Sequence, residues 1–308
     1  MKIRRYISRK SSIRCTQLCH LLVGYLSSKE MRRYAIFVIS LLALVGCIKQ
    51  SEGDDAFRYS LVVDGRIEQG RNAVVMLSQS LPYSSCYDED TYRKMAVWGA
   101  KVTIFCGDES DVLTSRRDSD YPTECIYTGW NIEGEVGKSY AIEIEYSGRS
   151  WRSETVILPS IELTDIEVVE TDDGLYLIEA TLPPTPYHCS IDCSIDGSHY
   201  YAPTPLGTYP PSDVARRITI NHPFANLIRT DYTTLFKGTE SVSLRVNTLS
   251  DFAFTYWRKW EDNFINSLNP IFPSTSNLPT NISNSGLGIW SGYGTSYYHI
   301  GVIGEYNM

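Results

Sequence analysis

Cys47 is the residue whose surroundings most clearly predict chemistry. It ends the run Leu44-Val45-Gly46-Cys47, in which a small residue precedes a cysteine. Arg32 and Arg33 form a short basic segment before it, and residues 35–45 are almost unbroken apolar sequence. Such a run suits the h-region of an export signal and is too short to span a bilayer, which needs about 20 apolar residues. The order of these parts predicts a lipoprotein signal peptide over residues 31–46, cleavage before Cys47, and a diacylglycerol on its thiol.

The position of this signal raises the question of where translation starts. Counted from Met1 the signal has 46 residues, more than the usual length, and counted from Met31 it has 16. We therefore expect residues 1–30 to be an over-extended N-terminus, with an unusually long n-region as the alternative. Residues 47–56 are polar and read as a tether. Their acidic residues are similar to surface-export signals, although a solvated linker explains them equally well. We expect a protein anchored by lipid in the outer membrane, facing the periplasm or the surface.

The charge of the remaining chain excludes some partners. Residues 1–46 hold nine of the 28 Lys and Arg and one of the 36 Asp and Glu, so the rest carries 19 basic and 35 acidic residues, a net charge of −16. Nucleic acids and anionic lipid surfaces attract basic patches. We therefore expect no nucleic-acid partner, and contact with the membrane through acyl chains.

Five of the eight cysteines lie beyond Cys47, in a compartment where disulfides persist. Cys106 ends the strand-like run KVTIFC, and Cys125 begins CIYTGW. If these runs pair as neighbouring antiparallel strands, the two thiols can form a disulfide. Cys189 and Cys193 lie in HCSIDCS, followed by His199. Zinc sites usually show two paired ligand clusters, so we expect loop cysteines and surface histidines there, and no metal site or cofactor.

Three further patterns resemble functional motifs and are interpreted as structural. Residues 134–139, GEVGKS, lack the first glycine of a phosphate-binding loop and precede a strand, which predicts a hairpin turn. The acidic stretches at 88–90 and 108–111 lack the glycine of a calcium-binding EF-hand loop and are expected to be solvated loops. No G-x-S-x-G elbow of a serine hydrolase occurs. His222 and His299 have no recognisable partners in the sequence.

The elements that would position these residues are mostly strands. In YAIEIEY, Tyr140, Ile142 and Ile144 share one face, which is the period of a strand with one buried side. Similar runs separated by Gly, Pro, Asp and Ser recur along the chain, including SVSLRVNTL at 241–249. We expect an all-β protein with two β-sandwich-like domains, an immunoglobulin- or transthyretin-like one at 57–159 and another at 160–308.

One amphipathic helix is expected in the C-terminal domain, near 251–268. Phe252, Tyr256, Trp260 and Phe264 recur at four-residue spacing, and Ser250 or Asp251 can cap its N-terminus. An aromatic stripe of this kind usually packs a helix onto a sheet, and it can also line a ligand groove.

The chain as a whole resembles an envelope lipoprotein family of the Bacteroidota, domain-of-unknown-function family 4249. The resemblance covers about residues 31–300. It is carried by the cysteine-ending signal and, in order, by the segments LVVDGRIEQG, VVMLSQSLPY, VWGAKVTIF, GEVGKSYAIEIEYSGRSWRSETVILPS and NPIFPSTSNLPTNISNSGLGIWSGY. The resemblance implies a β-rich envelope protein that partners a TonB-dependent outer-membrane receptor. It implies no catalytic residues.

Three functions remain open on the sequence. The first is a non-catalytic accessory lipoprotein that binds a nutrient or docks on a receptor through loops at one end of its sandwiches. The second is an envelope hydrolase of glycan or peptide, which a pocket with converging carboxylates or a metal would favour. The third is a surface adhesin or structural protein. The absence of catalytic motifs favours the first and the third.

Overall fold

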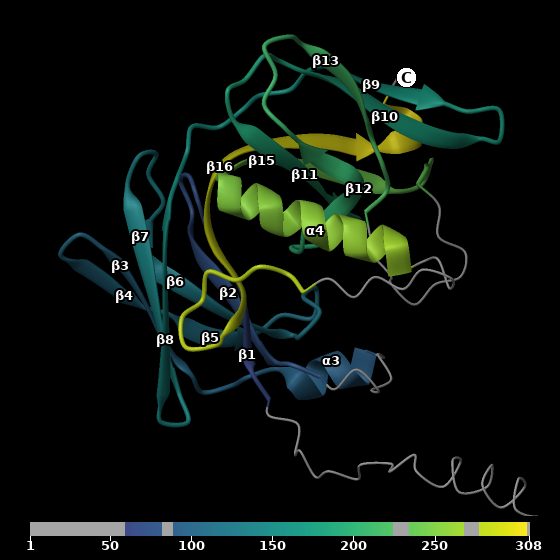
Figure 1. The fold of residues 1–308 in the computed structure, drawn as a ribbon. Coiled ribbons are helices and arrows are strands. Elements are labelled where there is room, and N and C mark those ends of the chain that lie inside the picture. Colours follow the sequence, from purple (N-terminus) through teal and green to yellow (C-terminus); the bar gives the residue numbers. More distant parts are fainter. Residues whose placement is uncertain (1–58, 82–88, 224–233, 268–276, 307–308) are drawn as a thin grey trace, which may run out of the picture. The chain divides into compact units, whose positions relative to one another are not determined.

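Figure 1 shows the computed structural model of the chain, which describes residues 59–81, 89–223, 234–267 and 277–306. The predicted signal peptide, Cys47 and the tether lie outside the described residues. The described residues belong to one compact unit. The all-β prediction is confirmed, since the described residues form sixteen strands in three sheets with two α-helices and a short 3-10 turn. No helix in this part of the chain is long and apolar enough to cross a membrane.

The elements follow one another along the chain with short connections. They are β1 (Leu61–Glu68), β2 (Asn72–Gln79), α3 (Glu89–Met95), β3 (Lys101–Cys106), β4 (Glu109–Val112), β5 (Thr114–Arg117), β6 (Cys125–Glu133), β7 (Ser139–Tyr146), β8 (Arg149–Val156), β9 (Thr164–Glu170), β10 (Leu175–Leu182), β11 (His188–Ile195), β12 (Ala202–Tyr209), β13 (Arg216–Ile220), β14 (Phe236–Lys237), β15 (Ser241–Leu249), α4 (Asp251–Ser267), β16 (Leu287–Val302) and the 3-10 turn η1 (Ile303–Glu305).

An eight-stranded sheet joins the two halves of the sequence. Its order is β12-β11-β15-β16-β1-β2-β6-β5, and β1 pairs in parallel with β16, so that Val62 lies opposite Leu287. The two smaller sheets are β4-β3-β7-β8 and β13-β10-β14, the latter extended by β9. Strands from both sides of the predicted boundary near Pro159 therefore share one sheet.

Most buried hydrophobic side chains fall into two large clusters. One cluster gathers buried side chains up to Ile157, together with Ile282 and Trp290, and the other gathers side chains from Ile161 onwards. The sheet β4-β3-β7-β8 contributes Val102 and Ile144 to the first cluster, and β10 and β13 contribute Ile178, Ala180 and Ile218, among others, to the second. Both clusters lie against the central sheet in a sandwich-like arrangement.

Helix α4 covers the opposite face of the central sheet from β9, β10 and β13 (Figure 1). It confirms the predicted helix. Ser250 caps its N-terminus, since the Ala253 N–H donates to the Ser250 hydroxyl at 3.2 Å and the Phe254 N–H donates to the Ser250 carbonyl at 2.9 Å. Ala253 and Tyr256 are buried with Ile289 and Tyr293 of β16. The aromatic stripe therefore packs the helix onto the sheet.

Several local predictions are corrected or confirmed by the strands. The HCSIDCS segment is not a loop but strand β11, and its two cysteines are buried in the second core cluster. Glu89 and Asp90 begin α3 and are not in a loop, whereas Asp88 lies outside the described residues. Residues 134–138 form a turn between β6 and β7, in which Gly137 has a positive φ of 81°. The predicted hairpin is wrong, because β6 and β7 belong to different sheets.

Candidate functional site

The face of the central sheet beneath α4 carries a row of charged and polar side chains. Because side chains alternate along a strand, Asp64, Arg66 and Glu68 of β1 all point to this face, while Val63 and Ile67 point into the core. Asp192 on β11 and Arg245 on β15 are opposite each other in the sheet register, and so are Ser190 and Asn247. We call this row the polar face.

Arg245 is the centre of the polar face. Its side chain and that of Glu68 are both only 5% exposed, and its Nη1 lies 2.8 Å from Glu68 Oε1. Its Nη2 and Nε donate to Asp192 Oδ2 at 2.7 and 3.2 Å. Asn247 Nδ2 donates to the same Asp192 oxygen at 2.8 Å. The Arg66 Nε lies 2.9 Å from Glu68 Oε1. Two guanidinium groups therefore balance Glu68 and Asp192 in a network with little access to water.

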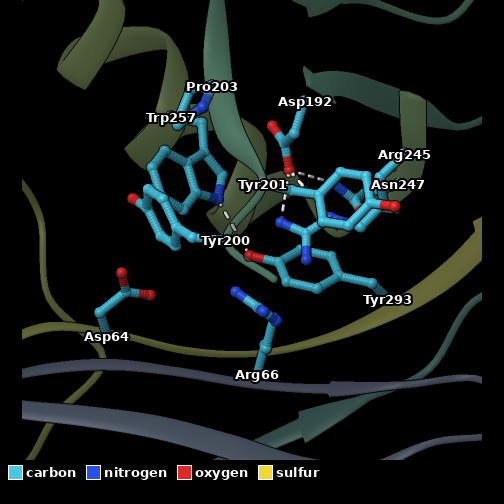
Figure 2. A pocket seen from close by; sticks show the side chains of 10 residues that line it. All are labelled: Asp64, Arg66, Asp192, Tyr200, Tyr201, Pro203, Arg245, Asn247, Trp257 and Tyr293. Atoms are coloured by element: carbon cyan, nitrogen blue, oxygen red, sulfur yellow. Dashed lines mark hydrogen bonds and ion pairs between the residues drawn. The ribbon is translucent and has the colours of Figure 1, made fainter. Parts of the chain in front are cut away.

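Asp64 differs from the other two carboxylates of this face. The described part of the chain gives its side chain no hydrogen bond and no ion pair, and Figure 2 shows it apart from the hydrogen-bonded groups. Burial raises the pKa of Asp64 despite the charges of Arg66 and Arg245 nearby. For Glu68, burial acts in the same direction, but Arg245 and Arg66 together hold its pKa below the usual range. Glu68 is therefore ionised at neutral pH, and Asp64 retains its proton to a higher pH.

A cavity lies between this face and α4 (Figure 2). Its volume is about 20 Å³, and it is lined by Asp64, Arg66, Asp192, Tyr200, Tyr201, Pro203, Arg245, Asn247, Trp257 and Tyr293. The Trp257 indole N–H donates to the Tyr293 hydroxyl at 2.9 Å. A volume of this size holds about one water molecule. A larger ligand therefore enters only if the aromatic side chains around the cavity move.

A second, smaller cavity of about 10 Å³ shares Asp192, Pro203 and Trp257 with the first. Glu261 of α4 lines it with a side chain that is 3% exposed. Its Oε2 accepts a hydrogen bond from the Thr208 hydroxyl at 2.5 Å, while its Oε1 is buried without a hydrogen-bond partner. Burial raises the pKa of Glu261. A second carboxylate with a free oxygen thus lies on the other side of Trp257.

The turn that carries Tyr200 and Tyr201 is attached to the segment before β6. The His199 Nδ1 lies 3.3 Å from Asp118 Oδ2 and 3.5 Å from Asp120 Oδ2. The three groups are close enough to hold a cation. However, Asp118 already pairs with Arg116 Nη1 at 3.0 Å. The His199 backbone N–H also donates to Asp120 at 2.7 Å. These contacts fix the position of the segment that carries Tyr200 and Tyr201, the tyrosines that line the cavity.

The residues singled out in the sequence do not meet at this site. Cys106 lies on β3 and Cys125 on β6, which belong to different sheets. The strand pairing on which the expected disulfide depended is therefore absent, and both thiols are free. Cys189 and Cys193 are free thiols in the core, and burial raises the pKa of Cys189 to about 12, so it is a poor metal ligand.

The acidic stretch at 108–111 is solvated only at its start, where Asp108 lies in an exposed turn and Glu109 is exposed in β4. Asp111 lies in β4 with its side chain buried, and its Oδ2 accepts hydrogen bonds from the N–H groups of Trp130 and Asn131 at 2.8 and 2.9 Å. Burial alone raises the pKa of Asp111, but these hydrogen bonds lower it overall. Its role is to hold the end of β6.

The polar face was not predicted as a site, although a pattern in the sequence is consistent with it. In LVVDGRIE, charged residues alternate with apolar ones, and in SVSLRVNTL the residues Arg245 and Asn247 do the same. Alternation of this kind is normally interpreted as a strand with one face in water. Gly65 is a second sequence feature of this strand: a Cβ at this position would lie 2.9 Å from the Trp290 ring on the opposite face.

The comparisons with known proteins identify a family and no activity. The family model described as "Domain of unknown function (DUF4249)" matches residues 50–298, and the chain therefore belongs to this family. No curated protein matches the chain.

Proposed function

We propose that this member of the DUF4249 family is a non-catalytic accessory lipoprotein, anchored in the outer membrane through Cys47, that binds a small polar nutrient in the cavity beneath α4. Docking on a TonB-dependent receptor is part of the same proposal and rests on the resemblance of the whole chain to envelope lipoproteins. The observation that carries the binding function is the cavity itself, in which buried charged groups and aromatic rings converge.

The composition of the lining supports binding of a polar molecule. Stable globular proteins seldom keep several charged groups inside unless the groups have a role, because desolvation is costly. Here Asp64 and Arg66 lie beside Tyr200, Trp257 and Tyr293 in one cavity. Burial raises the pKa of Tyr293 to about 12, so its hydroxyl stays protonated and can donate or accept a hydrogen bond. The site differs from the expected loops at a sandwich end, since it lies on a sheet face.

Two carboxylates that face one cavity, Asp64 and Asp192, also favour a hydrolase as the second candidate. In such an enzyme one carboxyl group retains a proton and the other stays ionised. Against this, Asp192 Oδ2 accepts three hydrogen bonds from Arg245 and Asn247, which fix it in place. A group held in this way serves structure and binding better than it serves as a general base.

A thermal-shift screen of amino acids, sugars, nucleosides and amines tests the binding function. A ligand at 100 times its Kd stabilises the native state by about 2.7 kcal/mol, which raises Tm by about 5–10 °C in a domain of this size. Trp257→Leu should abolish the shift. Trp130→Leu is the matched control, since Trp130 is 71% exposed and does not line the cavity. A hit that is unaffected by Trp257→Leu, or no hit at all, contradicts binding at this site, and product formation from a hit establishes the hydrolase.

Membrane fractionation of the full-length protein tests the anchor. The wild-type protein should sediment with the outer membrane, Cys47→Ser should not, and Cys106→Ser should behave as wild type because Cys106 is far along the chain in β3. If Cys47→Ser still sediments with the membrane, the lipid anchor is refuted. Co-purification of a β-barrel receptor with the wild-type protein supports the docking part of the proposal.

A further inference from the structure

We infer that the ligand of the cavity beneath α4 carries a positively charged nitrogen, an ammonium or a guanidinium group, and that the Asp64 carboxylate binds it. This inference rests on the proposed binding function and specifies its ligand class.

Within the described part of the chain, the carboxylates of the polar face are not equally paired, although a third guanidinium, that of Arg71, also acts on Glu68. Three carboxylates, those of Asp64, Glu68 and Asp192, face two guanidinium groups, those of Arg66 and Arg245. Glu68 contacts both guanidinium groups, at 2.9 and 2.8 Å, and Asp192 contacts Arg245 at 2.7 Å. Only Asp64 is left without an ion pair, and it faces the cavity. Asp64 is thus the carboxylate of this face that no guanidinium contacts, and the cavity is the place from which a ligand can supply a cationic partner.

The remaining lining suits a cation and disfavours an anion. Trp257 and the tyrosines at 200, 201 and 293 line the cavity that Asp64 also lines (Figure 2), and aromatic faces attract positive charge. The same protein already places guanidinium groups over tyrosine rings, with Arg245 5.1 Å from the Tyr201 centroid and Arg71 4.2 Å from that of Tyr297. An anion would instead compete with Glu68 and Asp192 for Arg66 and Arg245.

Glu261 adds a second carboxyl group on the same side of the sheet, and its Oε2 lies 3.7 Å from the Arg258 guanidinium. Its buried Oε1 has no partner, and its cavity adjoins that of Asp64 across Trp257. Asp64 lines the first cavity and Glu261 the second, and each has a carboxyl oxygen without a hydrogen bond in the described structure. Both groups therefore favour a positively charged ligand. A neutral sugar can stack on the aromatic rings and accept hydrogen bonds, but it offers Asp64 no cationic partner.

Calorimetric titration of the folded protein with matched probes tests this inference. The cationic probes are methylammonium, methylguanidinium and choline, and their uncharged counterparts are N-methylacetamide, methylurea and 3,3-dimethylbutan-1-ol. We expect at least one cation to bind at least 10-fold more tightly than its counterpart. Asp64→Asn should remove at least 10-fold of that affinity, while Asp173→Asn, which removes an exposed carboxylate from a turn between β9 and β10, should leave it unchanged.

The outcomes separate this inference from the proposed function. If a neutral counterpart binds as tightly as its cation, or if Asp64→Asn binds the cation as tightly as wild type, the ligand class is wrong while the cavity remains a binding site. If no probe binds and the nutrient screen gives no hit that depends on Trp257, the binding function fails as well. Should Asp64→Asn not fold, the comparison of charged and neutral probes on the wild-type protein decides alone.

Discussion

Replacing Arg245 by methionine should strongly destabilise the protein, because Arg245 is buried and pairs with both Glu68 and Asp192. The substitution keeps an unbranched side chain of similar length but removes the guanidinium group. Glu68 would then keep Arg66 at 2.9 Å and the Tyr297 hydroxyl. Asp192 would lose the guanidinium that it contacts and two of the three hydrogen bonds to its Oδ2, and it would keep the one from Asn247 at 2.8 Å. The main cost is therefore a buried and uncompensated Asp192 charge.

The size of this cost follows from the burial of the network. Removing one partner of a buried ion pair costs about 3–5 kcal/mol. Because Asn247 and Arg66 remain in place, we expect the lower end, about 3 kcal/mol at pH 7. Urea unfolding, followed by tryptophan fluorescence, should show the midpoint falling by about 1 M if m is about 3 kcal/mol/M.

The pH dependence of this variant has a definite sign. The pKa of Glu68 is lowered in the folded protein, so its ionisation stabilises the fold above the unfolded pKa, and that contribution is lost as pH falls through the folded pKa. In Arg245→Met part of this contribution is already missing. The difference in unfolding free energy between wild type and variant should therefore narrow in acid.

Two further variants make the reasoning refutable. Arg217→Met is the matched control, because Arg217 also contacts two carboxylates, Glu167 and Glu179, but on the exposed surface of β13. It should change the urea midpoint far less than Arg245→Met. Arg245→Met/Asp192→Asn should recover part of the loss, since the stranded charge is gone. If Arg245→Met is as stable as wild type, or if Arg217→Met is equally destabilising, the account of the polar face as a coupled charge network is wrong.

Three other predictions concern single residues of the fold. The pKa of Asp64 is raised in the folded protein, so its ionisation destabilises the fold as pH rises above the unfolded pKa of about 3.9. In urea titrations, the unfolding free energy of Asp64→Asn should therefore increase relative to that of wild type between pH 4 and pH 7. A difference that stays constant across this range would contradict the direction of the pKa shift. Asp111→Ala should lower the unfolding free energy by about 2 kcal/mol in the same assay, because the N–H groups of Trp130 and Asn131 lose their buried acceptor. A loss below about 0.5 kcal/mol would show that water replaces the carboxylate. Ser250→Ala should cost about 1 kcal/mol through loss of the α4 cap, whereas Ser250→Thr should cost less, and equal losses for both would argue against capping.

The fold class could be predicted from the sequence because local periodicity determines it. Tyr140, Ile142 and Ile144 alternate with polar residues, and all three are buried as predicted. The helix at 251–267 was predicted from its aromatic spacing and Ser250. The shared central sheet could not be predicted, since β1 pairs with β16 across more than 200 residues and nothing local specifies that partner.

The candidate site was missed for a related reason. A period of two shows that Arg245 and Asn247 share a strand face, but it does not show what covers that face. The structure places α4 and the segment 198–201 over Arg245 and Asn247, so that both are buried. The same limit applied to the HCSIDCS segment, in which buried Cys189 and Cys193 lie on the core face of a strand. A polar residue that alternates with apolar ones is thus ambiguous until its covering element is known.

The most direct test of the account is an NMR titration that follows the six tryptophan indole N–H groups. Trp257 donates its indole N–H to Tyr293 inside the cavity, whereas Trp130 is exposed elsewhere. With the resonance of Trp257 assigned through Trp257→Phe, the protein is titrated with the solute that gives the largest thermal shift. The account predicts that the Trp257 resonance moves in a saturable manner while that of Trp130 stays in place. A solute that binds and leaves the Trp257 resonance unmoved would contradict the claim that the cavity beneath α4 is the binding site.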